Sequence, residues 1–486
     1  MVIRRVVVAV VVLVALAAGL GVLWPSLSLH GQPAAFAQGQ TLLQAVVREV
    51  HLRYIDATVD DSTLYTGARD GVLKASGSSC ARTVADTSAP PATPERIAAL
   101  VTAATQRCTP APDASALYFG AARGMLDSLG DPYTRFMDPR AFDEFRQDQK
   151  GYFFGIGILI DLKDKRLIVV QPIPGTPAAR AGLRAGDRIN TIDGLPTAEM
   201  SLPEAVAHIR GPRGSQVTLG IERGDRILLT KTIVRDRIEM LAAEGGETLD
   251  ASTQATLQQA GIGYIRLVTF NDNTEKMFAS ALHAAMQSGA RALILDLRNN
   301  GGGLLDISLQ VLDHFVPAGQ ARVHTVDRDG RKETDRATSG VAKITLPTVV
   351  LVNEFTASAS EIVSGALQDH HVAVLVGVKT YGKGVIQTIV DLPMSSGAAI
   401  TTAKYLTPSE HDIHHKGLQP DVVVGEAEEA IRARLQGKPD DVVDEQVKQM
   451  RAAQLARAIE ILKQKLGRSD LRHVRVLSAT RLAAAA

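Results

Sequence analysis

The chain has 486 residues, and its 53 Lys and Arg nearly balance its 52 Asp and Glu, which gives a formal net charge of +1. A chain of this length holds about two to four domains and can bury a sizeable core. The charge balance excludes the strongly basic or acidic character that would indicate nucleic acid or an acidic partner.

Residues 1–37 are typical of an exported protein. The basic stretch MVIRR is followed directly by an apolar run at 6–24, which predicts a signal peptide. The small-x-small sequence AFA at 35–37 predicts cleavage to a mature chain that starts near Gln38. The apolar run is also close to the roughly 20 residues that span a bilayer, so a retained N-terminal anchor is the alternative. We expect export to the bacterial periplasm or cell envelope, as a soluble protein or one tethered through 6–24.

Residues 38–149 form a predicted helical region, because apolar positions in TLLQAVVREVHLRYI recur every three to four residues. The sequence DDSTLYTGARDGVL at 60–73 resembles DASALYFGAARGML at 113–126, which indicates one duplicated helical element. Two copies are too few for a solenoid, which needs about three or more repeats.

The two cysteines, Cys80 and Cys108, lie in a segment rich in Ser, Ala and Pro between those copies. In an oxidising compartment, two nearby cysteines favour a disulfide that closes a local loop. Two unpaired thiols are the alternative, and a metal site lacks the ligands it would need.

Three further regions follow along the chain. Residues 150–236 contain short β-branched runs separated by Gly and Pro turns, which predicts a small β-rich module with one helix after Ser201, a candidate N-cap. In residues 237–425 strands alternate with helices, expected at 272–288, 304–316 and 358–369, so we predict an α/β fold with central parallel strands. Residues 426–486 have helical spacing.

The sequence EFTASASE at 354–361 places Ser358 between a buried strand and a helix. Ser358 and Glu361 match a capping box, which would only satisfy amides at the helix start. The same strand-to-helix turn faces the crevice where α/β proteins place reactive groups. A serine there is a candidate nucleophile, provided that a neighbouring base takes its proton.

Lys383 is the candidate base, because none of the 12 histidines stands in a motif beside this serine. A lysine can act as a base near neutral pH only if burial disfavours its ammonium form. Glycines on both sides, at 382 and 384, let the backbone enter a crowded site. Gln387 could orient the amine, and an exposed loop lysine is the alternative.

The glycines of NNGGG, Gly301, Gly302 and Gly303, follow a strand and lead into a helix. Such a loop can direct backbone amides at a developing oxyanion, or it can be a flexible turn. A phosphate-binding loop would need a Lys-Ser or Lys-Thr pair after the glycines, and GLLDIS has none. Three strand ends thus carry a serine, a lysine and an amide-rich loop, which together indicate a Ser-Lys hydrolase.

The motifs TASASEIVSGALQD, VGVKTYGKGVIQ, LDLRNNGGG and KGLQPDVVV resemble those of the carboxyl-terminal processing (tail-specific) serine protease family, closely over about residues 150–425 and more loosely over 42–145. The resemblance implies a serine endopeptidase without metal or cofactor, with Ser358 as nucleophile, Lys383 as base and Gln387 orienting the lysine. It implies an oxyanion hole from the amides of Gly302 and Ala359. It also implies a crotonase-like (ClpP-like) α/β core with an inserted PDZ domain.

The β-rich module fits that PDZ domain, which captures an extended peptide by strand addition and holds its terminal carboxylate on backbone amides. By the resemblance, Ile156, Gly157 and Ile158 form the carboxylate loop, and Val206 and Ile209 wall the groove. The implied substrates are proteins with free, apolar C-termini. Asp187 in AGDRI is interpreted as a structural turn residue rather than a ligand.

Two stretches depart from the family pattern. The cysteine segment at 77–112 has no counterpart in it, so this region is a candidate site for a different partner. The sequence EHDIHH at 410–415 replaces the usual turn, and its histidines could suggest a metal site, although adjacent residues of a polar loop rarely converge on one ion.

By analogy with the family, we expect a homo-oligomer and a helical-repeat adaptor as partners. Two other functions stay open. A catalytically silent PDZ scaffold would have no reason to keep Ser358, Lys383 and Gln387 together, and an apolar-ligand carrier on the same core would be expected to lose the lysine.

Overall fold

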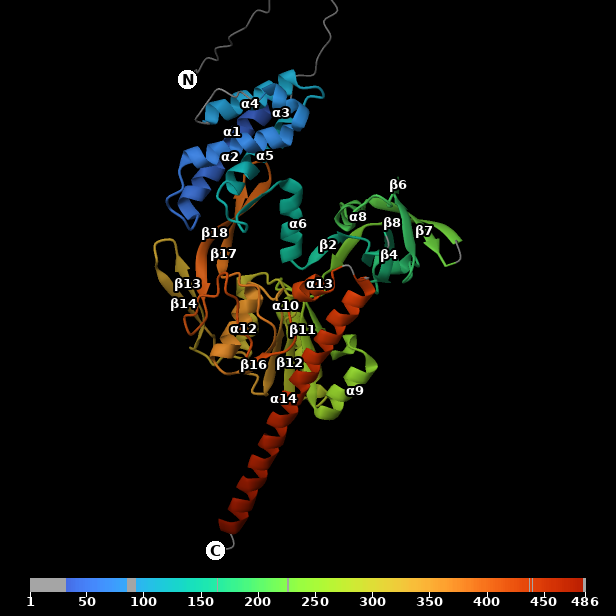
Figure 1. The fold of residues 1–486 in the computed structure, drawn as a ribbon, viewed down its shortest axis with the longest axis vertical. Coiled ribbons are helices and arrows are strands. Elements are labelled where there is room, and N and C mark those ends of the chain that lie inside the picture. The colour runs from blue at the N-terminus through green and yellow to red at the C-terminus, as the bar shows by residue number, and fades with distance from the viewer. Residues whose placement is uncertain are drawn as a thin grey trace, which may run out of the picture.

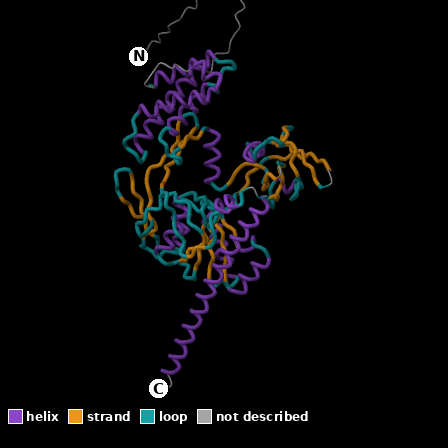
Figure 2. The backbone as a smooth tube through the Cα atoms, in the orientation of Figure 1, coloured by secondary structure: helices purple, strands orange, loops and turns teal. Residues whose placement is uncertain are grey.

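The structure is a computed structural model that describes residues 32–84, 93–163, 165–224, 227–436, 438 and 440–483. The apolar run at 6–24 lies outside the described residues. Figures 1 and 2 show a group of N-terminal helices at one end, an α/β core below it, and a β-rich module to one side. A long C-terminal helix crosses the core and extends beyond it.

In the described residues up to Asp127, five helices occur: α1 (Gln32–Arg53), α2 (Asp61–Ser76), α3 (Ser78–Val84), α4 (Pro94–Arg107) and α5 (Ala114–Asp127). The two copies of the duplicated sequence are α2 and α5. Each is capped by an aspartate, since Asp60 accepts from the amide of Thr63 and Asp113 from that of Ala116. The expected cleavage sequence at 35–37 lies within α1.

The helices α2 and α5 cross at paired glycines. A Cβ atom added to Gly71 would lie 2.0 Å from the carbonyl oxygen of Gly120, and one added to Gly67 would lie 2.2 Å from that of Gly124. Since real Cβ atoms do not approach so closely, the contact requires the two glycines that each copy carries at the same spacing. A disulfide joins Cys80 of α3 to Cys108, the residue after α4.

The β-rich module lies between β2 (Tyr152–Gly155) and β9 (Asp236–Glu239), which pair with each other. Its sheet has the order β3-β4-β5-β7-β8, with β6 paired to β5. The strands are β3 (Ile158–Lys163), β4 (Arg166–Pro172), β5 (Arg188–Ile192), β6 (Leu195–Pro196), β7 (Gln216–Arg223) and β8 (Ile227–Val234), with helices α7 (Pro177–Arg180) and α8 (Leu202–Ile209). Ser201 caps α8 as predicted. Asp187 is buried and ion-paired to Arg223, which confirms a structural role.

The core sheet has the order β10-β11-β12-β15-β16-β19, and all its pairs except β10 with β11 are parallel, as predicted. Its strands are β10 (Ala243–Gly245), β11 (Ile262–Leu267), β12 (Ala292–Asp296), β15 (Thr348–Val352), β16 (Ala373–Gly377) and β19 (Val422–Val423). The strands β12 and β15 are buried along their whole length, because both faces of the sheet are covered.

Helices cover the two faces of this sheet separately. Residues of α10 (Thr274–Gln287), α11 (Leu305–Asp313) and α12 (Ala359–Asp369) pack with Leu295 and Val350 on one face. Residues of α9 (Ala251–Ala260) and α14 (Asp440–Ala483) pack with Ile294 and Leu351 on the other. The short elements η1 (Gly246–Thr248) and α13 (Glu428–Arg434) complete this part.

A second, antiparallel sheet stands beside the core and was not predicted. It contains β1 (Arg135–Met137), β13 (Ala321–Asp327), β14 (Lys332–Arg336), β17 (Val385–Leu392) and β18 (Ser396–Leu406), and α6 (Pro139–Gln149) packs on β18. The pairing of β1 with β18 brings the end of the N-terminal region against the core. In the described part of the chain, no helix combines the length and the apolarity that crossing a membrane requires.

Candidate active site

Three loops at the carboxyl ends of core strands line one cavity of about 510 Å³. Gly301 and Gly303 follow β12, Ser358 and Ala359 follow β15, and Lys383 follows β16. Since parallel strands end at the same edge of a sheet, the strand order places these loops side by side. The structure therefore brings together the serine, the lysine and the glycine loop of the sequence motifs.

Ser358 has an unusual backbone conformation, with φ of 56° and ψ of −120°, directly before α12. A residue other than glycine rarely adopts such a positive φ, and the strain costs about 1–3 kcal/mol. Gly302 packs against this turn so closely that an added Cβ would lie 2.9 Å from the amide nitrogen of Ala359. Strain of this kind is found where a fold holds one side chain in a required position.

Glu361 joins the serine turn to the lysine loop. Its buried carboxylate accepts hydrogen bonds from the backbone amides of Ser358 at 2.9 Å and Lys383 at 2.9 Å. It also accepts from the amide of Gly382 and the hydroxyl of Thr380, at 2.8 and 2.6 Å. Burial raises the pKa of Glu361, against the lowering effect of these donors. Glu361 supplies the carboxylate half of the predicted capping box, and the same carboxylate also holds the candidate base.

The amine of Lys383 is partly shielded from solvent. Burial lowers the pKa of Lys383, and the nearby charge of Arg135 lowers it further. Asp131 and Glu361 act in the opposite direction. The Nζ atom lies 5.0 Å from the centre of the Tyr133 ring. A lysine in this setting is closer to its neutral, basic form than a solvated one.

Tyr405 is a second link between the two loops. Its hydroxyl donates to the carbonyl oxygen of Ser358 at 3.2 Å, and its backbone amide donates to the carbonyl oxygen of Gly384 at 3.0 Å. Tyr405, Tyr133 and Arg135 were not predicted from the sequence. They come from the antiparallel sheet and from the turn before it, far from both motifs in sequence, so no local pattern could have identified them.

The candidate oxyanion donors are placed differently from one another. Ala359 is the first residue of α12, where backbone amides lack partners within the helix, and it lines the cavity. The amide of Gly302 donates to Oδ1 of Asn300 at 2.9 Å, and Gly302 is buried, while Gly301 and Gly303 line the cavity. The side-chain amide of Gln387, which also lines the cavity, donates from Nε2 to Thr401 Oγ1 at 3.3 Å.

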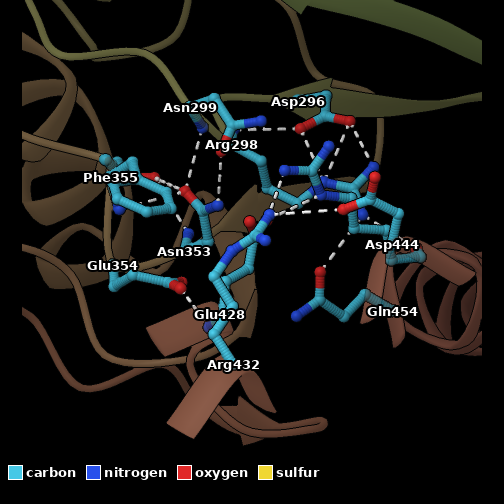
Figure 3. Close-up of polar contacts among 12 residues, drawn as sticks. Asp296, Arg298, Asn299, Asn353, Glu354, Phe355, Glu428, Arg432, Asp444 and Gln454 are labelled. Atoms are coloured by element: carbon cyan, nitrogen blue, oxygen red, sulfur yellow. Dashed lines mark hydrogen bonds and ion pairs between the residues drawn. The ribbon is translucent and has the colours of Figure 1, made fainter. Parts of the chain in front are cut away.

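The glycine loop is held from behind by a polar cluster that reaches the C-terminal helix (Figure 3). Asn299 and Asn353 exchange two hydrogen bonds, of 2.9 and 2.7 Å, which tie the glycine loop to the serine loop. Arg298 binds the buried Asp296 and donates to the side chain of Gln454 in α14. The ion pair of Asp296 with Arg298 lowers the pKa of Asp296 although burial opposes this.

A second cavity, of about 930 Å³, runs along the β-rich module. It is lined by all five residues that the sequence analysis assigned to peptide binding: Ile156, Gly157, Ile158, Val206 and Ile209. Met240 lines both this groove and the cavity of Ser358, so the two adjoin. In the described ranges, no three His, Cys, Asp or Glu side chains are grouped to hold a metal ion, and this includes the histidines after Glu410.

Comparison with known proteins places this geometry in a family. A model of peptidase family S41 matches residues 261–424, and one of the PDZ domain matches residues 168–228. A carboxyl-terminal-processing protease of Synechocystis is 41% identical over 311 residues, which cover 63% of this chain and 70% of that protein. The chain belongs to peptidase family S41. This S41 peptidase is thus an enzyme that carries a PDZ domain, as the sequence analysis predicted.

Two further relatives of this S41 peptidase are named for the same activity. A carboxyl-terminal-processing protease of Picosynechococcus is 38% identical over 322 residues, covering 65% of this chain and 75% of the relative. The solved structure of the photosystem II D1 C-terminal processing protease is 30% identical, covers 79% of this chain and 93% of that one, and has a TM-score of 0.44.

Proposed function

We propose that this S41 peptidase is a serine endopeptidase that binds protein C-termini in its PDZ domain and cleaves the bound chain with Ser358 and Lys383. One observation carries the proposal. The carboxylate of Glu361 holds the backbones of both residues, at 2.9 Å each, at the wall of one cavity. A serine nucleophile requires a neighbouring base, and here one buried carboxylate holds the strained serine turn next to the loop of a desolvated lysine.

The reaction follows from these groups. The neutral amine of Lys383 accepts the proton of the Ser358 hydroxyl as the oxygen attacks the scissile carbonyl carbon. The carbonyl oxygen becomes an oxyanion, which the amide of Ala359 and one amide of the glycine loop stabilise. Lys383 then gives its proton to the leaving amine, and water hydrolyses the acyl-enzyme by the same steps.

The second oxyanion donor comes from the glycine loop, where Asn300 already accepts one of the backbone amides. The family resemblance implies Gly302, whose amide donates to Oδ1 of Asn300 in this structure. A donor at Gly302 must leave Asn300 or share its proton, whereas Gly301 and Gly303 already border the cavity. Gln387 would act by accepting or donating a hydrogen bond at the amine of Lys383 once substrate excludes water from the cavity.

The PDZ groove supplies the choice of substrate. Its lining is largely apolar, with Ile156, Ile158, Val206 and Ile209 on it, which suits an apolar tail. Gly157 has a φ of 77°, and an added Cβ would lie 2.4 Å from the Cβ atom of Thr176, so this position of the loop has no room for a side chain. Bare backbone amides are what hold a terminal carboxylate in such domains.

We further propose a division into a signal or anchor at 1–37, helices at 38–149, a PDZ domain at 150–236, a crotonase-like core at 237–425 and a helical tail at 426–486. Export to the periplasm or cell envelope is supported by the basic and apolar N-terminus and by the disulfide of Cys80 and Cys108. The homo-oligomer and the helical-repeat adaptor are supported by analogy alone.

The test compares the purified chain with its Ser358→Ala and Lys383→Ala variants on an unstructured protein that ends in apolar residues, with a free or an amidated C-terminus. We expect cleavage by the unmodified chain alone, faster for the free carboxylate. Ser364→Ala is the matched control, because Ser364 is a buried serine of the same helix whose hydroxyl has no hydrogen-bond partner in the described structure. Equal cleavage by the Ser358→Ala variant would refute the assignment, and loss of cleavage in all four proteins would favour the silent scaffold.

A further inference from the structure

The loop of Lys383 is clamped on its outer side by residues 414–418. The amide of His415 donates to the carbonyl oxygen of Gly382 at 2.8 Å, and Thr380 and Leu418 exchange hydrogen bonds of 3.1 and 2.7 Å. The two segments leave no space between them. A Cβ on Gly382 would lie 2.7 Å from the amide nitrogen of Gly417, and one on Gly384 would lie 2.8 Å from that of His414.

Within this clamp, one side chain contacts the residue next to the base. The Nδ1 atom of His414 accepts a hydrogen bond from the backbone amide of Gly384 at 3.3 Å. Because a backbone amide can only donate, Nδ1 must be unprotonated for this contact to exist. The His414 ring also lies 6.2 Å from the ring of Tyr133, whose centre is 5.0 Å from Nζ of Lys383.

The surroundings of His414 determine its protonation. Burial lowers the pKa of His414 below the ordinary value of 6.5. From its own loop, His415 lowers the pKa further and Asp412 raises it. From neighbouring elements, Lys404 of β18 lowers it and Asp131, in the turn before β1, raises it, and Tyr133 faces the ring from that same turn. The ring is therefore neutral at and above neutral pH.

We propose that neutral His414 is a positioning residue for Lys383, which fixes the loop of the base through the Gly384 amide and releases it when the ring is protonated. This inference rests on the proposed role of Lys383. A protonated ring has no acceptor, so the Gly384 amide loses its partner. The added positive charge lies next to the tyrosine ring that faces the lysine amine, where it opposes the positive charge that Lys383 gains as it accepts the proton of Ser358.

The experiment measures kcat and KM from pH 5 to 9 on the unstructured substrate with a free apolar C-terminus. His414→Asn keeps an acceptor oxygen that does not titrate, and His414→Ala removes the acceptor. At pH 8 we expect kcat to fall about tenfold in His414→Ala, with KM unchanged, and to stay within about threefold in His414→Asn. A side chain that only filled space would not show this split.

The second measurement is the slope of the pH profile of kcat/KM on its acidic side. In the unmodified chain, log(kcat/KM) should fall with a slope of 1 while Lys383 alone is protonated, and more steeply than 1 over the pH range in which His414 also becomes protonated. His414→Asn should keep the slope of 1. The matched control is His415→Asn, since His415 is exposed and has a φ of 58°, a conformation that asparagine tolerates. This variant should keep the steep limb.

Two results would overturn the inference. One is an acid slope in His414→Asn that equals that of the unmodified chain, and the other is an unchanged kcat in His414→Ala. If His414→Ala does not fold, the slope of the asparagine variant still decides. The same measurements separate this inference from the proposed function. If the proposed function is wrong, the Lys383→Ala variant stays active. If only the role of His414 is wrong, the Lys383→Ala variant is inactive.

Discussion

The carboxylate of Glu361 accepts a hydrogen bond from the backbone amide of Lys383 at 2.9 Å. The same carboxylate oxygen accepts from the amide of Ser358, and Tyr405 bonds to the carbonyl oxygens of Ser358 and Gly384. Glu361 and Tyr405 therefore hold the main chains of the serine turn and of the lysine loop, and none of these bonds uses the functional side chain of Ser358 or Lys383. Preorganisation of this kind is what the reaction requires, because misplacement by about 1 Å can cost a hundredfold in rate.

Substituting Glu361 by glutamine should separate the two loops. Glutamine keeps one acceptor oxygen, but its NH2 group would face backbone amides that also donate. We expect kcat to fall by at least about a hundredfold and stability to fall by about 2–3 kcal/mol, since buried donors are left unsatisfied. Steady-state kinetics and urea unfolding measure these effects. Full activity of Glu361→Gln would show that the shared carboxylate is dispensable.

Substituting Tyr405 by phenylalanine removes only the 3.2 Å hydrogen bond to the Ser358 carbonyl oxygen. We expect a fall of about tenfold in kcat and a loss of about 1 kcal/mol in stability, in the range of one neutral hydrogen bond. Tyr118→Phe is the matched control, because the buried Tyr118 hydroxyl has no hydrogen-bond partner among the described residues. That control should keep full activity, and a similar loss in both variants would contradict the role given to Tyr405.

The lowered pKa of Lys383 predicts a pH dependence of both rate and stability. The rate should rise with pH as the amine loses its proton and level off below the ordinary lysine pKa of about 10.4. The buried ammonium destabilises the fold fully below its folded-state pKa, and this cost disappears as pH rises towards the unfolded-state pKa. Lys383→Met should therefore be inactive yet about 1 kcal/mol more stable at pH 7. Thermal unfolding at pH 7 and 10 tests this, and the gain should shrink at pH 10.

The crossing of α2 and α5 should tolerate no side chain at Gly71. The Cβ of Gly71→Ala would meet the Gly120 carbonyl oxygen at 2.0 Å, so the helices must separate, at a cost of about 2–4 kcal/mol. The matched control is Gly467→Ala in α14, where nothing lies within 4 Å of an added Cβ. It should stabilise the chain by about 0.5–1 kcal/mol through the higher helix propensity of alanine. A harmless Gly71→Ala would mean that the two helices do not cross at this glycine.

The parts of the fold that the sequence predicted are those with local patterns. The core strands are continuous apolar runs, and the helices at 274–287 and 359–369 nearly match the expected ranges. Ser358 and Lys383 could be found because each sits between a buried strand and a turn with an unusual composition. The antiparallel sheet could not be found this way, since Arg135 pairs with Ala399 across most of the chain. Tyr133 lies in the turn directly before β1, and Tyr405 lies in β18, so both belong to the sheet that was not predicted.

The pairing of Tyr152 with Glu239 has a consequence for engineering. Because the peptide-binding module departs and returns through neighbouring strands, its two ends lie beside each other, and the catalytic core is continuous without it. Such a module behaves as an exchangeable cassette. A PDZ domain with another preference, joined through the same two strands, should redirect the choice of tail while Glu361, Tyr405 and the groups they hold keep their arrangement.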